Sequence, residues 1–109
     1  MVTKIYNDKN SIMSNEGVIY FDIETTGFDK ENDKIMLISY GRFNSGEFVI
    51  KQIFADNLSE ERDLMTLFAE DIKDADAWCS YNGIAFDEPI IRKKLQMHGI
   101  EASLPDEHL

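Results

Sequence analysis

The sequence predicts an α/β domain built on a mixed β-sheet, and three observations predict it. Three apolar segments of strand length follow one another at 18–23, 34–43 and 47–54. An apolar pattern with helical spacing comes next, and a short strand then precedes a second helix. The expected order is therefore strand-strand-strand-helix-strand-helix. Because a helix joins the third and fourth strands, we expect the fourth strand to run parallel to a neighbour.

The first three strands are recognised by their length and by what separates them. Segment 18–23 is too short and too apolar for an amphipathic helix and is typical of a central strand. The charged segment 28–34 is expected to be a loop. Segments 34–43 and 47–54 flank residues 44–46, Asn-Ser-Gly, which favour a hairpin turn.

The first helix is expected after Ser59, whose side chain can cap it. Glu60 and Glu61 then fall in the first turn, where the helix dipole favours negative charge. Apolar residues with helical spacing predict one buried face. They are Leu64, Leu67, Phe68 and Ile72.

The second helix is predicted over residues 87–98, after a short strand at 77–81. Pro89 falls in its first turn and Gly99 can end it. His98, near the last turn, is expected to interact with the helix dipole. The apolar face of this helix is formed by Ile91 and Leu95, with His98 beside them.

The bulk properties are those of one small globular domain. The chain has 109 residues, 43% hydrophobic, with a net charge of −10. We expect residues 1–16 to form a polar N-terminal arm and residues 17–109 to form the domain. The acidic balance argues against a broad surface that binds nucleic acid by neutralising phosphates. With Cys79 as its only cysteine and no apolar run of the ~20 residues that span a bilayer, the chain is expected to be cytoplasmic, without a membrane partner.

Two carboxylates interrupt the first strand, in the stretch IYFDIETTGF. Successive strand side chains point to opposite faces, so Asp22 and Glu24 share one face. Two adjacent carboxylates repel each other, and a bound divalent cation would compensate for this repulsion. The alternative is that they mark a strand that runs into a turn.

A third carboxylate, Asp87, is expected where the second helix begins. If the first and fourth strands are parallel neighbours, it converges with Asp22 and Glu24 at one end of the sheet. Mg²⁺ and Mn²⁺ take oxygen ligands of this kind, and two such ions can promote phosphodiester hydrolysis. Two plainer alternatives remain: Asp87 caps the helix, and Asn82 with Gly83 forms only a turn.

Together the two motifs FDIETTG and NGIAFD resemble those of the DEDD superfamily of 3′→5′ exonucleases, over roughly residues 18–99. The resemblance implies a ribonuclease H-like fold, Mg²⁺ or Mn²⁺ as cofactor, and a single-stranded DNA or RNA 3′ end as substrate. Stand-alone exonucleases and the proofreading domain of family B DNA polymerases are most similar. The implied metal ligands are Asp22, Glu24 and Asp87, and the residues implied to lie beside the terminal nucleotide are Thr25, Thr26, Phe28 and Asn82.

The third motif of that superfamily, a Tyr or His followed four positions later by Asp, has no match here. His98 is followed by Ala102 at that spacing and Tyr81 by Ala85. We therefore expect the fold to lack its last strand and helix, the chain to belong to a longer parent, and the fragment to be inactive alone. The competing hypotheses are a non-catalytic ribonuclease H-like binding module and a structural domain with capping acids.

Overall fold

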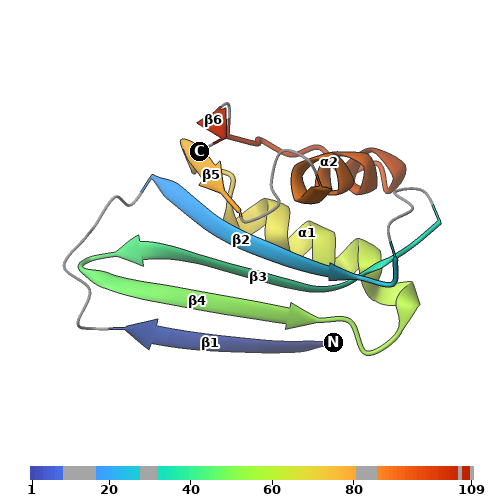
Figure 1. The fold of residues 1–109 in the computed structure, drawn as a ribbon, viewed down its shortest axis with the longest axis horizontal. Helices are drawn as coiled ribbons and strands as arrows, with labels where there is room; N and C mark the ends of the chain where they lie inside the picture. The colour runs from blue at the N-terminus through green and yellow to red at the C-terminus, as the bar shows by residue number, and fades with distance from the viewer. Residues whose placement is uncertain (9–16, 28–31, 81–85, 106, 109) are drawn as a thin grey trace.

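A computed structural model describes residues 1–8, 17–27, 32–80, 86–105 and 107–108 of the chain. Their strands form one six-stranded sheet in the order β1-β4-β3-β2-β5-β6, and two helices pack against it (Figure 1). The elements are β1 (Val2–Asp8), β2 (Val18–Thr25), β3 (Ile35–Asn44), β4 (Glu47–Phe54), the 3₁₀ turn η1 (Leu58–Glu60), α1 (Glu61–Asp71), β5 (Ala77–Cys79), α2 (Glu88–Met97) and β6 (Glu107–His108).

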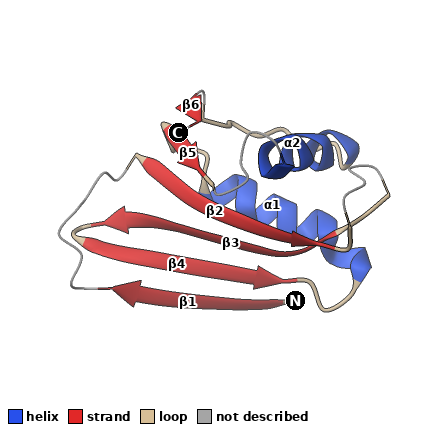
Figure 2. Cartoon of the chain, viewed as in Figure 1, coloured by secondary structure: helices blue, strands red, loops and turns tan. Residues whose placement is uncertain are grey.

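The sheet is mixed, as predicted. Strands β1 to β4 pair antiparallel, whereas β5 runs parallel to β2 and β6 parallel to β5. Helix α1 is the crossover that connects β4 to β5. In the sheet, β5 lies next to β2, on the side of β2 away from β3 (Figure 2). The carboxyl ends of β2 and β5 therefore lie at the same end of the sheet, where open α/β sheets gather functional groups.

A two-residue turn joins β3 and β4. Ser45 and Gly46 both have positive φ, 52° and 84°, as a type I′ turn requires, and Asn44 pairs with Glu47 across it. This turn geometry matches the twist of the flanking strands, so it fixes the register of the central hairpin. The predicted hairpin is thus confirmed.

The hydrophobic core lies between the helices and one face of the sheet. Phe21 of β2 packs against Phe68 of α1 and Trp78 of β5, with ring centroids 6.2 Å and 5.1 Å apart. Tyr40 of β3 meets Phe68 edge-on. The buried members of α1 and α2 include Leu64, Met65, Phe68, Ala69, Ile72, Ile90, Ile91 and Leu95.

Helix α1 differs from its prediction at two points. Ser59 does not cap it: Asn57 and Glu60 form a reciprocal capping box over the preceding turn η1, and α1 follows Glu60 without a side-chain cap of its own. Leu67 was predicted on the buried face but is exposed. Its place on the helix puts it at the edge of the stripe that Leu64 and Phe68 define.

Both ends of the chain hold a strand that the sequence did not predict. Residues 2–8 of the expected polar arm form β1, which pairs with β4 and is the edge strand of the sheet. Residues 9–16 lie outside the described part. Backbone pairing orders this strand, and an edge strand needs no continuous apolar face. Beside β5, where the sequence predicts that the last strand of the fold is missing, residues 107–108 add the two-residue strand β6. Among the described residues, no helix is long and apolar enough to cross a membrane.

Candidate active site

Asp22 and Glu24 lie on the exposed face of β2. They alternate with the buried residues Phe21 and Ile23, which face the helices, so the two carboxylates point to the opposite side of the sheet. We call this side the open face. The two acids therefore lie next to each other on one accessible surface, as the sequence predicts.

A groove on the open face passes beside Asp22. Its walls include Tyr20 and Phe48, whose rings meet edge-on 5.9 Å apart. The ring of Phe48 packs directly on Gly41: a Cβ added at Gly41 would come within 2.7 Å of the ring. The groove thus joins a carboxylate to an aromatic surface, and it depends on a glycine in the middle of β3.

Asp87 is buried immediately before α2, where only 1% of it is exposed. Asp87 occupies the N-cap position of α2, but its side chain makes no capping hydrogen bond to the helix. The hydroxyl of Ser80 instead donates to Asp87 Oδ2 over 2.7 Å. Ser80 directly follows β5, whose register places Cys79 beside Tyr20. This contact attaches Asp87 to the end of the sheet that carries Asp22.

The three acids do not form a complete metal site. Within the described residues, no three His, Cys, Asp or Glu side chains gather closely enough to hold one ion. Asp22 and Glu24 are two carboxylates on one exposed strand face, and Mg²⁺ commonly binds through one or two carboxylates and completes its shell with water and phosphate. Asp87 does not join this pair in the structure.

The threonines after Glu24 shape the turn that leaves β2. Thr25 donates its hydroxyl to the carbonyl of Gly27. Thr26 donates to Asp33 Oδ1 over 2.9 Å and accepts from the backbone of Lys34 over 2.9 Å. The described parts of this turn are thus tied across to the start of β3. Two further residues singled out in the sequence, Phe28 and Asn82, lie outside the described residues.

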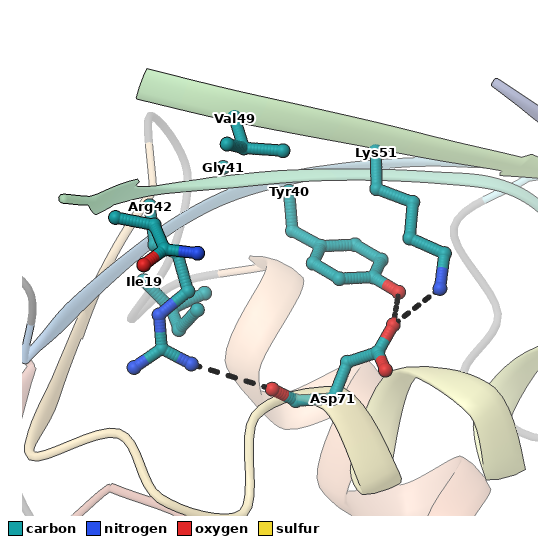
Figure 3. Close-up of a pocket in the computed structure, with 8 residues that line it drawn as sticks. Ile19, Tyr40, Gly41, Arg42, Val49, Lys51 and Asp71 are labelled. Carbon is teal, nitrogen blue, oxygen red and sulfur yellow. Dashed lines mark hydrogen bonds and ion pairs between the residues drawn. The ribbon is translucent and has the colours of Figure 1, made fainter. Parts of the chain in front are cut away.

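A second pocket lies on the helix side of the sheet, where side chains of β3 and β4 contact the end of α1 (Figure 3). Tyr40 donates its hydroxyl to Asp71, the last residue of α1, and Lys51 reaches the same carboxylate over 2.7 Å. Arg42 pairs with Asp74 over 2.9 Å. Asp71 lies at the negative end of the α1 dipole, where a carboxylate is unfavourable, and these donors compensate for it. The cations here are engaged with carboxylates of the chain itself, so the pocket is not organised to bind an anion.

The environment of Tyr40 is expected to make the free energy of unfolding depend on pH in the alkaline range. Burial, and next the hydrogen bond to Asp71, raise the pKa of Tyr40 above its ordinary value. Above pH of about 10 the unfolded chain loses this phenol proton while the folded protein keeps it. The free energy of unfolding should therefore fall as pH rises, by less than the single-group limit of about 1.4 kcal/mol per pH unit.

Urea unfolding of the natural protein and Tyr40→Phe at pH 9, 10 and 11 checks this expectation. The variant retains the ring but has no phenol to ionise, so its stability should fall less over the same range. The other three tyrosines are present in both proteins, so any contribution from them cancels in the comparison. Parallel pH profiles would contradict the assignment.

The sequence did not reveal a buried charged cluster formed by Glu61, Lys94 and His98, which we call the Glu61 cluster. Glu61 and Lys94 are each 1% exposed. His98 was expected to interact with the helix dipole, yet its Nε2 lies 2.7 Å from Glu61 Oε1. The only sequence signal was Lys94, which falls between the apolar positions Ile91 and Leu95 on the buried face of α2.

Comparison with known proteins places the chain in a family. Residues 19–109 match the RNase_H superfamily, so the chain belongs to the ribonuclease H superfamily. A DNA polymerase of Methanocaldococcus jannaschii is 27% identical over 94 residues, which cover 79% of this chain and 6% of the polymerase. The chain thus spans a small part of that relative's length.

The fold also matches a solved polymerase. The family B DNA polymerase of the archaeon Pyrobaculum calidifontis superposes with a TM-score of 0.55 at 21% sequence identity, covering 76% of this chain and 11% of that one. At this identity the likeness concerns the fold alone. Together the comparisons identify a ribonuclease H-like, nuclease-type domain similar to part of a DNA polymerase.

Proposed function

We propose that the chain is part of a 3′→5′ exonuclease domain that hydrolyses the phosphodiester bond at the 3′ end of a DNA or RNA strand. The observation that carries the proposal is the pair Asp22 and Glu24 on the open face of β2, in a member of the ribonuclease H superfamily. Two like charges on one strand face repel each other and contribute nothing to the core. A cation-binding role explains why both are there.

In this proposal Asp22 and Glu24 hold a Mg²⁺ or Mn²⁺ ion. The bound ion supplies an activated water molecule and stabilises the charge that develops on the phosphate oxygens. Asp87, held by Ser80 in the structure, is the third ligand and must turn toward the pair to take part. The two carboxylates on β2 need no such movement, because they are already exposed on one face.

The net charge of −10 is compatible with a nucleic-acid strand that the protein binds only at the 3′ end. A broad basic surface is not required if cations at Asp22 and Glu24 meet the terminal phosphate. Thr25, Thr26, Phe28 and Asn82 are proposed to lie beside the terminal nucleotide. The third motif of the superfamily, which has no match in this chain, supplies the fourth carboxylate. In this proposal that carboxylate would come from a longer parent protein.

The second candidate is a non-catalytic ribonuclease H-like binding module. The observation in its favour is that Asp22, Glu24 and Asp87 do not gather into a metal site. A binding module would keep the fold and the aromatic groove beside Asp22 without needing the ion. Metal binding therefore separates the two candidates.

Thermal unfolding with and without Mn²⁺ is the test of the proposed function. An ion that binds only the folded state stabilises it by about 2.7 kcal/mol at 100 times its Kd, which is a rise of several degrees in Tm. Asp22→Asn should remove this response and raise the Tm of the metal-free protein, since it relieves the repulsion with Glu24.

The matched control is Asp63→Asn, which removes an exposed acid of α1 on the other side of the sheet. It should respond to Mn²⁺ as the natural protein does. A Tm that is indifferent to Mn²⁺ and Mg²⁺ in a folded sample would favour the binding module.

A further inference from the structure

The Glu61 cluster connects three elements through a single carboxylate. Glu61 Oε2 accepts the backbone N–H of Ile35, the first residue of β3, over 2.7 Å. Glu61 Oε1 lies 2.7 Å from His98 Nε2 and 3.5 Å from Lys94 Nζ. The carboxylate is thus shared between the start of β3 and the last turns of α2.

These contacts lie next to the segments that carry the candidate acids. Ile35 pairs with Thr25, the residue after Glu24, so one side of the cluster is attached to the end of β2. On the other side, Lys94 and His98 follow Asp87 by seven and eleven positions and therefore share its side of the helix. Asp87 lies at the N-terminal end of α2, and the Glu61 cluster contacts α2 near its C-terminal end.

The energetics of the cluster argue for a specific role. A buried ammonium is costly unless it is paired, and Lys94 Nζ makes no hydrogen bond among the described residues. In other proteins, replacing a buried ion pair by apolar residues of similar size is often neutral or stabilising. Glu61 and Lys94 are therefore not needed to fill space, and what they add is a fixed, directional connection between α2 and β3.

We infer that Glu61 is a positioning residue, which sets the place of Asp87 relative to Asp22 and Glu24 by anchoring α2 to the start of β3. This inference rests on the proposed function. Mutating a group that hydrogen-bonds directly to a metal ligand typically costs 10–100-fold in metal affinity, which sets the scale for a group that positions a ligand. Glu61 would act in this way through the length of α2, without touching the ion.

Two double variants separate positioning from simple stability. Glu61→Gln with Lys94→Met removes both buried charges but keeps an oxygen that accepts the Ile35 N–H. Glu61→Met with Lys94→Met removes the charges and this connection together. Neither variant leaves an unpaired buried charge, so both are expected to fold, which circular dichroism verifies. Asp63→Ala, at an exposed position of α1, is the matched control.

The readouts are Mn²⁺ affinity, from the electron paramagnetic resonance signal of the free ion, and amide chemical shifts in the metal-free proteins. The Met/Met variant should bind Mn²⁺ at least 10-fold more weakly than the Gln/Met variant, and its amide shifts should change at Ser80 and Asp87 as well as at Ile35. Equal affinities, with shift changes confined to Ile35 and His98, would overturn the inference.

The two proposals fail differently. If the natural protein binds no Mn²⁺, the proposed function fails, and the chemical shifts alone then decide the inference. Changes at Ser80 and Asp87 in the Met/Met variant would still support the anchoring of α2 by Glu61. Unchanged shifts at these two residues would overturn it.

Discussion

Glu24→Ala is expected to abolish removal of nucleotides from a 3′ end by a longer form of this protein that carries the third motif. The loss should be several orders of magnitude, because stabilisation of the developing charge and orientation of the attacking water supply most of the barrier reduction. The fold should remain intact, since Glu24 lies on the open face and contributes nothing to the core. The assay is a 3′-labelled single strand with Mn²⁺ or Mg²⁺, analysed by fragment length.

Two comparisons make this result specific. The 109-residue chain should leave the strand intact, because no Tyr or His in it is followed four positions later by Asp. Glu101→Ala, which removes an exposed acid after α2, should keep full activity in the longer form. A longer, folded, metal-supplied protein that leaves the strand whole would favour the binding module.

The order of the central elements could be predicted from sequence because each carries its own local signal. The strand at 47–54 matches its predicted bounds, and the turn at Ser45 and Gly46 matches the predicted hairpin. The edge strand β1 could not be predicted, because its order comes from pairing with β4 and not from its own pattern. Backbone pairing between distant segments does not require a particular pattern of side chains, so the sequence of a polar segment does not indicate it.

The candidate site was predictable only in part, for a related reason. Alternation along β2 places Asp22 and Glu24 on one face, and this is a purely local consequence of strand geometry. The place of Asp87 depends on how α2 packs, and its bond to Ser80 spans residues outside the described part of the chain. Local patterns therefore predict which acids share an element, but not how elements bring acids together.

The Glu61 cluster shows the same limit more sharply. Glutamate in a first helical turn normally indicates an exposed position near the positive end of the dipole. Here tertiary packing places Lys94 and His98, 33 and 37 residues further along the chain, against that carboxylate. The residues close to Glu61 in the sequence do not indicate that Lys94 and His98 will contact it. Buried polar clusters of this kind are a property of the assembled fold.

Phe68→Ala is expected to have the largest effect on stability of any single truncation in α1. Phe68 is fully buried and packs against both Phe21 of β2 and Tyr40 of β3, so it joins the helix to the centre of the sheet. Truncating a buried phenylalanine typically costs about 3–5 kcal/mol. Small domains have only about 5–15 kcal/mol in total, so the variant should lose a large fraction of the stability of the protein.

Its neighbour Leu67 provides the matched control. Leu67 is 37% exposed, so Leu67→Ala removes an apolar side chain of the same helix with little loss of packing and should cost less than about 1 kcal/mol. Urea unfolding followed by circular dichroism measures both. Equal losses in the two variants would mean that α1 does not present Phe68 to the sheet. Since α1 also carries Glu61, the anchoring of α2 would then lose its structural basis.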